Sequence, residues 1–241
     1  MKIKQYLLLV TSLIIAISGC SRQKQNRDIL FQISTIDAIS KGLYDGKMSY
    51  GELRDYGNFG IGTFDGVDGE LFGLAGELYQ IKADGIAYPV EDSMKTPFAV
   101  FTFFECDKSE SLDRTSSYEE LQQYLDNLLP TKDIFYAIKI EGVFPYIKTR
   151  CVPKQNKPYP PFSEVVKNQQ IFEFNDVRGT IVGFRFPAYI GGINYPGYHL
   201  HFLAEDRKSG GHLLECQTGN LRIEIDYTPQ FRMALPEAGI K

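Results

Sequence analysis

Residues 198–212 read YHLHFLAEDRKSGGH and carry the most informative pattern of the chain. Apolar side chains alternate with imidazoles in its first half, and this is typical of a β-strand, on which residues two apart project from the same face. Leu200 and Phe202 are therefore predicted to point into a core, while His199 and His201 project together from the other face. The polar, glycine-ended segment 205–211 predicts a hairpin loop, after which the chain returns as a second strand.

All three histidines of the chain lie in this predicted hairpin. If the returning strand places His212 opposite Leu203, the three imidazoles share one face. Three neutral imidazoles form an open zinc site that keeps positions for water or substrate. The alternative is a set of three solvated histidines on an exposed hairpin. Carbonic anhydrases and cupins also use two histidines in this spacing with a third ligand, so spacing alone leaves hydration, isomerisation, oxygenation and decarboxylation open.

Composition predicts a sheet-rich globular protein. The 241 residues are 43% hydrophobic and 23% charged, which is enough apolar material for one large domain or two small ones and excludes disorder, collagen and a coiled coil. Aromatic residues make up 13% without a single Trp, and 22 Gly and 12 Pro favour strands and turns. The 26 basic residues against 30 acidic ones argue against a nucleic-acid partner, because phosphates require a basic face.

The first 20 residues predict export and a lipid anchor. Two lysines precede an apolar run at residues 7–17, which is too short for a membrane span but fits the core of a secretory signal. The run leads into ISGC at residues 17–20, which resembles the lipobox of bacterial lipoproteins. We therefore predict a signal peptide over residues 1–19, lipidation of Cys20 and a polar tether over residues 20–30. The alternative is an ordinary cleaved signal peptide followed by a chance cysteine.

Three short segments carry helix signals. Ser49 with Glu52, and Ser117 with Glu120, have the spacing of a capping box, and Pro130 stops the helix that Ser117 begins. The predicted helices cover residues 49–57, 117–129 and 163–170.

Strand signals are more numerous than helix signals. Nearly continuous apolar runs with β-forming residues predict strands at residues 98–104, 135–140 and 180–186. The glycine-rich stretch 60–76 indicates tight turns or closely packed backbone, and the four prolines of 153–161 predict an extended connection. Because strand-rich material lies on both sides of the long helix, we place a boundary near Pro130, between an N-terminal α+β subdomain over 31–130 and a β-rich, histidine-bearing subdomain over 131–241.

Beyond Cys20, the chain has three cysteines, Cys106, Cys151 and Cys216. An exported location permits a disulfide, but an odd number leaves at least one thiol free. The sequence contains no CxxC or other tight metal spacing, so cysteine is not predicted to carry the chemistry.

Three ordered blocks of sequence resemble the α-acetolactate decarboxylase family. The first is YGNFGIGTFDGVDGE at 56–70 with GELYQ at 76–80, and the second is KTR at 148–150, VPKQ at 152–155 and KPYPP at 157–161. The third is GGINYPGYHLHF at 191–202 with DRKSGGH at 206–212. The resemblance covers the chain from about Ile33 to Leu235.

This resemblance implies an α+β fold of two sheet-rich subdomains with mixed or antiparallel sheets and few helices. It also implies conversion of 2-acetolactate to acetoin and carbon dioxide at a Zn²⁺ ion. The leader sequence, for its part, predicts membrane contact through the lipid anchor alone, and a homodimer is left open. Carried over position by position, the zinc ligands are His199, His201 and His212, the catalytic residues are Glu70 and Arg150, and Thr63 lines the site.

The implied chemistry suits these residue types. The metal acts as an electron sink for the enediolate that forms when carbon dioxide leaves, so no organic cofactor is needed. Arg150 would orient the carboxylate or donate a hydrogen bond, and Glu70 would position or relay the final proton. The alternatives without the resemblance are a surface ion pair for Arg150 and a solvated strand end for Glu70.

Two departures from the family pattern affect these expectations. Family members continue past the position of Leu235 into a tail whose glutamate reaches the site, whereas only Glu237 is acidic in the last segment here, so the proton donor is left open. Cys151 replaces a small hydroxyl residue, either as a neutral substitution or as a partner for Cys216. Two further functions therefore stay open: a lyase or isomerase for another α-hydroxy-β-keto acid, and an exported zinc-containing binding protein without turnover.

Overall fold

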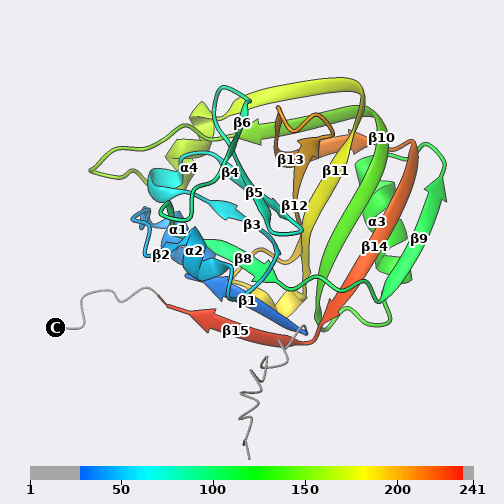
Figure 1. Cartoon of the computed structure of the whole chain (residues 1–241), viewed down its shortest axis with the longest axis horizontal. Helices are drawn as coiled ribbons and strands as arrows, with labels where there is room; N and C mark the ends of the chain where they lie inside the picture. Colours follow the sequence, from blue (N-terminus) through cyan, green and yellow to red (C-terminus); the bar gives the residue numbers. More distant parts are fainter. Residues whose placement is uncertain (1–27, 236–241) are drawn as a thin grey trace, which may run out of the picture.

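Two β-sheets make up most of the computed structural model, which describes residues 28–235. One sheet has seven strands and the other has six, with a separate two-stranded sheet at the periphery (Figure 1). A single strand pair in the seven-stranded sheet is parallel and its other pairs are antiparallel. This arrangement confirms the predicted α+β class with mixed and antiparallel sheets and few helices.

The seven-stranded sheet contains β1 (Ile29–Ile33), β3 (Phe59–Thr63), β4 (Glu70–Leu74), β5 (Glu77–Ile81), β6 (Ala87–Pro89), β8 (Ala99–Thr102) and β15 (Gln230–Ala234). The six-stranded sheet contains β9 (Lys108–Asp113), β10 (Phe135–Cys151), β11 (Gln170–Phe186), β12 (Gly197–Ala204), β13 (Gly210–Gln217) and β14 (Asn220–Thr228). The small sheet pairs β2 (Met48–Ser49) with β7 (Lys95–Thr96). The α-helices are α1 (Ile36–Ser40), α2 (Tyr50–Leu53), α3 (Tyr118–Leu128) and α4 (Phe162–Val165), and 3₁₀ turns cover Asp65–Val67, Val166–Asn168 and Ala188–Ile190.

Each of the two sheets contains strands from both halves of the chain. The first sheet has the order β15-β1-β8-β3-β4-β5-β6, and the second has β11-β12-β13-β10-β14-β9 with an additional β10–β11 pairing that closes four of its strands into a ring. β9 precedes residue 130 but lies in the second sheet, whereas β15 follows it but lies in the first. The two sheets therefore do not divide the chain at residue 130. The subdomain boundary near Pro130 stays a prediction.

The predicted histidine hairpin is formed by β12 and β13, but its register differs from the expectation. His212 lies opposite His201, and Leu203 lies opposite Gly210. The predicted pairing of His212 with Leu203 is therefore wrong by two residues, because Gly210 and Gly211 belong to the strand rather than to the loop. A Cβ on Gly210 would lie 2.1 Å from the Phe202 carbonyl oxygen, so only glycine allows this close pairing. A shift of two preserves the face, and the three imidazoles still project together.

The longest strands are β10 and β11, which have 17 residues each and pair antiparallel from Tyr136 opposite Arg185 to Cys151 opposite Gln170. The sequence predicts only their most apolar parts, 135–140 and 180–186. Outside these parts, fewer side chains of β10 and β11 are buried, and buried positions alternate with more exposed ones. Such alternation is a weaker sequence signal for a strand than a continuous apolar run. The predicted strand at 98–104 corresponds to β8, whose four residues are all buried.

The helix predictions hold where the signals are local. Both capping boxes form: the Ser49 side chain accepts from the Glu52 amide, and the Ser117 side chain accepts from the Glu120 amide. α3 ends at Leu128, just before Pro130. Two predicted helices are shorter than expected: α2 ends at Leu53 rather than at residue 57, and α4 with the following 3₁₀ turn ends at Asn168.

Two apolar cores border the strands that carry the histidines, one between the two sheets and one between the second sheet and α3. Between the sheets, Phe59 on β3 meets Phe184 on β11 with ring centroids 5.7 Å apart. Behind the second sheet, α3 packs against β12, and Leu200 and Phe202 join its core as predicted. The histidine face of β12 therefore points toward the first sheet, and its apolar face points toward α3.

Several expectations fall outside the described part. The signal peptide, Cys20, most of the tether and Glu237 lie in residues 1–27 and 236–241, which the structure does not describe. The tether is predicted to reach residue 30, whereas β1 already begins at Ile29. Within residues 28–235, no helix is both long and apolar enough to cross a membrane.

The α3 capping box gives a stability prediction. Ser117→Ala removes the side-chain acceptor of the Glu120 amide, and we expect the free energy of unfolding to fall by about 1 kcal/mol. Urea denaturation measures the change. Ser111→Ala, on the exposed edge of β9, is the matched control and should change stability by less than about 0.5 kcal/mol. Equal stability of the two variants would contradict a capping contribution.

Candidate functional site

Three imidazoles converge on the face of the β12–β13 hairpin that points toward the first sheet. His199 and His201 lie two residues apart on β12, and His212 faces His201 from β13. Their ring centroids are 5.0 to 5.2 Å apart, and one nitrogen from each ring lies within 4.8 Å of the others. These three side chains can hold a metal ion, as the sequence predicts.

His201 is oriented by the neighbouring sheet. Its Nδ1 lies 2.6 Å from the backbone carbonyl oxygen of Leu71 on β4, and its side chain is fully buried. A carbonyl can only accept a hydrogen bond, so this geometry assigns the ring proton to Nδ1 and leaves the Nε2 lone pair for a ligand. Nδ1 of His212 lies 3.3 Å from this Nε2, so both nitrogens face the same potential ligand position.

Burial keeps all three histidines neutral. It lowers the pKa of His199 to about 3, with a further decrease from the positive charge of Arg150. It also lowers the pKa values of His201 and His212 well below their ordinary value, and the positive charge of Arg150 contributes in both cases. The neutral imidazole is the form that binds metal ions, so no proton has to leave before a metal binds near neutral pH.

Glu70 and Arg150 form a buried pair beside the histidines. Arg150 Nη1 donates to Glu70 Oε1 at 3.0 Å, and Glu70 Oε2 lies 3.6 Å from His201 Nε2. The Glu70 side chain is 7% exposed and that of Arg150 is 14% exposed. Arg150 is therefore not part of a surface ion pair, and Glu70 is not a solvated strand end. Burial raises the pKa of Glu70, and the charge of Arg150 only partly opposes this shift.

Strand positions explain why these two side chains meet. Glu70 is the first residue of β4 and lies opposite Thr63 on β3. The preceding Gly69 has φ +82°, and a Cβ there would lie 2.2 Å from the Ile81 carbonyl oxygen, so the glycine permits the sharp entry into β4. Arg150 lies near the end of β10, opposite His212. The pair therefore joins the first sheet to the strand beside the metal-ligand candidates.

Thr63 lines the same pocket, but its hydroxyl is already used. Its Oγ1 donates to the Gly69 carbonyl oxygen at 2.7 Å, across the turn that leads into Glu70. The contact supports the position of Glu70, while the direct role that the resemblance implies for Thr63 stays a prediction.

A pocket of about 590 Å³ contains these groups. Thr63, Glu70, Arg150, His199 and His212 form part of its wall. The rest of the pocket wall is largely apolar, and sequence analysis did not assign it to the site. It comes mainly from α1, the segment around α4 and the loop before β12. These residues are Ile36, Ile39, Val67, Phe98, Val152, Phe162, Val166, Tyr195 and, on β12 itself, Tyr198. The spacing of Ile36 and Ile39 marks a helix face, but nothing in it indicates that the face borders a polar site.

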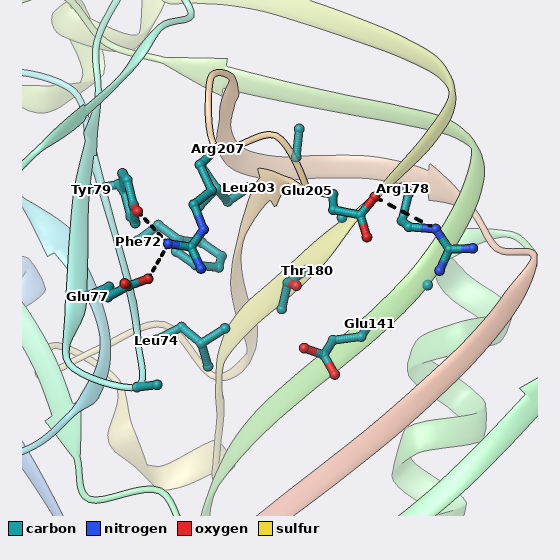
Figure 2. A pocket seen from close by; sticks show the side chains of 14 residues that line it. Phe72, Leu74, Glu77, Tyr79, Glu141, Arg178, Thr180, Leu203, Glu205 and Arg207 are labelled. Atoms are coloured by element: carbon teal, nitrogen blue, oxygen red, sulfur yellow. Dashed lines mark hydrogen bonds and ion pairs between the residues drawn. The ribbon is translucent and has the colours of Figure 1, made fainter.

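A second cleft of about 410 Å³ lies farther along the same two strands, β4 and β12 (Figure 2). Phe72 and Leu203 contribute apolar surface to it. Arg207, in the loop between β12 and β13, contacts Glu77 and donates to Tyr79 Oη at 3.0 Å. These contacts fasten the tip of the histidine hairpin to β5 of the first sheet.

The three cysteines of the described part are free thiols. Cys151 lies in the core between the sheets and Cys216 lies in the core behind the second sheet, so of the two alternatives for Cys151 the pairing with Cys216 is not formed. Burial raises the pKa of Cys216 to about 12 and also raises that of Cys151, so both thiols stay protonated. Cys151 is therefore a neutral, buried replacement next to Arg150.

Fold and site together define an α+β protein of two packed sheets with a histidine-lined, charge-bearing pocket. A family model described as Alpha-acetolactate decarboxylase matches residues 30–239. The chain therefore belongs to the α-acetolactate decarboxylase family, which is a family of carboxy-lyases.

Named relatives agree with this assignment. The chain is 49% identical to the alpha-acetolactate decarboxylase of Methanosarcina mazei, over 88% of this chain and 74% of the relative. It is 44% identical to that of Bacillus subtilis, over 86% of this chain and 81% of the relative. The crystal structure of alpha-acetolactate decarboxylase from Bacillus subtilis matches with a TM-score of 0.86 at 43% identity, covering 88% of this chain and 90% of that chain. These findings confirm the resemblance carried by the three sequence blocks.

The lowered histidine pKa predicts acid sensitivity in the metal-free protein. His199 has a pKa near 6.5 when unfolded and about 3 when folded, so between these values only the unfolded chain binds the proton. Its contribution to stability is therefore present above pH 6.5 and is lost as the pH falls toward 3. We expect the unfolding free energy of the wild type to fall more steeply than that of His199→Gln, by at most about 1.4 kcal/mol per pH unit.

Urea denaturation of chelator-treated protein at about pH 7 and about pH 5 measures this difference. The His199→Gln variant keeps every other titrating group, so the difference between the two slopes measures His199 together with its effect on the pKa values of His201 and His212. Parallel slopes would show that His199 is protonated equally in both states.

Proposed function

We propose that this protein decarboxylates 2-acetolactate to acetoin and carbon dioxide in the histidine pocket, with Zn²⁺ held by His199, His201 and His212. The observation that carries the proposal is the convergence of three neutral imidazoles beside a buried Glu70–Arg150 pair, in a chain of the α-acetolactate decarboxylase family. Carbon dioxide loss breaks one carbon–carbon bond, moves its electron pair toward the adjacent ketone and requires one proton at the carbon that held the carboxylate. The pocket contains groups suited to each requirement.

The donor set fits zinc. Three imidazole nitrogens are a common catalytic ligand set that leaves a position for substrate, and the Leu71 carbonyl supplies the outer hydrogen bond that metal-binding histidines usually make. Nδ1 of His199 is buried and has no hydrogen-bond partner among residues 28–235, as expected of a nitrogen reserved for a ligand. When bound, Zn²⁺ supplies Lewis acidity for the negative charge that develops as carbon dioxide leaves.

Arg150 is suited to bind the substrate carboxylate. One guanidinium nitrogen donates to Glu70, and the remaining donors of this planar group lie in the wall of the pocket. A buried guanidinium holds a carboxylate strongly because water competes weakly there. Its ring neighbour Phe162, 5.9 Å from the Arg150 Cζ atom, restricts the side chain from the α4 side.

Glu70 is suited to hold the proton that completes acetoin. Burial raises the pKa of its carboxyl group, so this group retains a proton more readily than an exposed glutamate. Oε1 is fixed by Arg150, and Oε2 faces the histidine cluster. We therefore propose proton transfer from Oε2 to the substrate carbon, a role for which the described residues of the pocket wall offer no second carboxyl group.

An exported location with a lipid anchor at Cys20 is also part of the proposal. It rests on the leader sequence of residues 1–20 alone. Under this proposal acetoin forms outside the inner membrane, and the tether holds residues 28–235 away from the lipid surface.

The direct test is acetoin formation from racemic 2-acetolactate by the purified protein. We expect turnover that a strong chelator abolishes and that added Zn²⁺ restores. Circular dichroism verifies that the chelated protein is folded, and elemental analysis gives the zinc content. A folded, zinc-loaded protein that forms no acetoin would contradict the proposal and favour the binding-protein alternative or another α-hydroxy-β-keto acid as substrate.

Substitution of Arg150 separates its role from that of the metal. We expect Arg150→Ala to retain zinc while kcat/KM falls at least about a hundredfold, because the carboxylate loses its buried donor. Arg150→Lys should recover little activity, since an ammonium lacks the planar donor array. Arg54→Ala, which removes an exposed 2.8 Å ion pair with Asp92, is the matched control and should behave as the wild type. Wild-type kinetics in Arg150→Ala would return Arg150 to a structural role.

A further inference from the structure

The three histidines are supported unequally. His201 is held by the Leu71 carbonyl oxygen. His212 lies on a strand paired on both sides, opposite His201 on β12 and opposite Arg150 on β10. His199, in contrast, makes no ring hydrogen bond to any residue in the described part of the chain: its buried Nδ1 is the nitrogen left for a ligand, and its other nitrogen has no protein partner that would orient the ring. The orientation of His199 must therefore come from the backbone that carries it.

That backbone has strand partners on one side. β12 pairs with β11 from Gly197 to Ala204, but it pairs with β13 only at residues 201–203. At residues 197–200, the ladder among the described strands is therefore the one to β11. A strand end supported from one side frays more easily than one inside a sheet. A further constraint near His199 would be needed to hold its ring at the ligand position.

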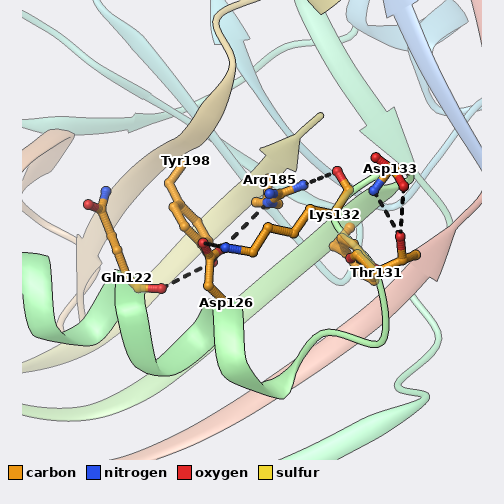
Figure 3. Close-up of polar contacts among 8 residues, drawn as sticks. Gln122, Asp126, Thr131, Lys132, Asp133, Arg185 and Tyr198 are labelled. Carbon is orange, nitrogen blue, oxygen red and sulfur yellow. Dashed lines mark hydrogen bonds and ion pairs between the residues drawn. The ribbon is translucent and has the colours of Figure 1, made fainter. Parts of the chain in front are cut away.

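Tyr198, directly before His199, supplies such a constraint. Alternation along the strand sends its side chain to the opposite face, toward α3. Its hydroxyl donates to Asp126 Oδ1 on α3 at 2.8 Å (Figure 3). Burial raises the pKa of Tyr198, so the hydroxyl keeps the proton that this bond requires.

Asp126 also binds the neighbouring strand. Its Oδ1 lies 3.6 Å from Nε of Arg185, and Arg185 is the residue opposite Tyr198 in the β11–β12 register. Its other oxygen, Oδ2, accepts from Lys132 Nζ at 2.6 Å, and Arg185 in turn donates to the Lys132 carbonyl oxygen. Burial alone would raise the pKa of Asp126, but hydrogen bonds from Lys132 and Tyr198 hold it below its ordinary value, so the carboxylate is charged. One carboxylate thus connects α3 to both strands at the level of His199.

We propose that Asp126 is a positioning residue for the histidine site, acting through the Tyr198 hydroxyl to fix residues 197–200 and with them the His199 ring. The proposal rests on the proposed metal-binding role of the histidines. A charged acceptor makes a stronger hydrogen bond than a neutral one, and this contact is partly shielded from water because the Asp126 side chain is 27% exposed. The helix behind the sheet therefore sets the geometry of a pocket that it does not line.

Tyr198→Phe tests the proposal with a minimal change. It removes the hydroxyl and keeps the ring in the core behind the second sheet. We expect the Zn²⁺ dissociation constant, measured by competition with a chromophoric chelator, to rise about tenfold. In the metal-free protein, hydrogen exchange of the amides at 197–200 should accelerate, while exchange in β10 is unchanged.

Tyr136→Phe is the matched control. It also removes a tyrosine hydroxyl, one that donates to the Thr131 carbonyl oxygen at 2.7 Å, from a residue packed in the same core. Both variants should lose similar thermal stability, but only Tyr198→Phe should weaken zinc binding. Equal zinc affinity of Tyr198→Phe and the wild type, or equal losses in both variants, would overturn the positioning role.

Two Asp126 variants complete the test. Asp126→Asn keeps an acceptor for Tyr198 and should bind zinc more tightly than Asp126→Ala, which removes it. Equal zinc dissociation constants for these two variants would contradict the role of the acceptor. The wild-type titration separates this inference from the function proposed above: a wild type that binds no zinc refutes the metal site itself, whereas a zinc-binding wild type with unaffected variants refutes only the positioning by Asp126.

Discussion

The site depends on one contact between the two sheets, the hydrogen bond between His201 Nδ1 and the Leu71 carbonyl oxygen. It joins residues 130 positions apart in the sequence. Because Glu70 precedes Leu71 on β4, the same contact that orients the imidazole also brings the carboxylate within 3.6 Å of it. A slip of one residue on either strand would send one of these side chains to the wrong face, since strands alternate with a period of two.

Electrostatics explains how this pocket tolerates so many ionisable groups. Burial disfavours charge, so the histidines stay neutral, while Glu70 and Arg150 offset part of each other's desolvation through their ion pair. Such a pair adds little to stability, because the attraction roughly balances the loss of hydration. Its position beside the imidazoles agrees better with the proposed roles in carboxylate binding and proton transfer than with a purely structural role.

Local patterns predicted what local forces determine. Both capping boxes form because the side chain and the amide they join lie within one helical turn, and the alternation around His199 separates a core face from a ligand face. The extent of β10 and β11 was underestimated, because their outer parts are held by partner strands rather than by their own hydrophobicity. The roles of Glu70 and Arg150 were accessible only through the family resemblance, since no spacing links a strand end at 70 to an arginine at 150.

The class of fold, the shared face of His199 and His201, and the family to which the chain belongs all follow from the amino-acid sequence alone. Only the tertiary structure decided that His212 faces His201, that Glu70 meets Arg150 across 80 residues, and that α1 and the α4 segment complete the pocket. The physical reason is that alternation and capping arise from neighbours along the chain. Register and pocket shape arise instead from hydrogen bonds and packing between strands far apart in sequence, which a local pattern does not encode.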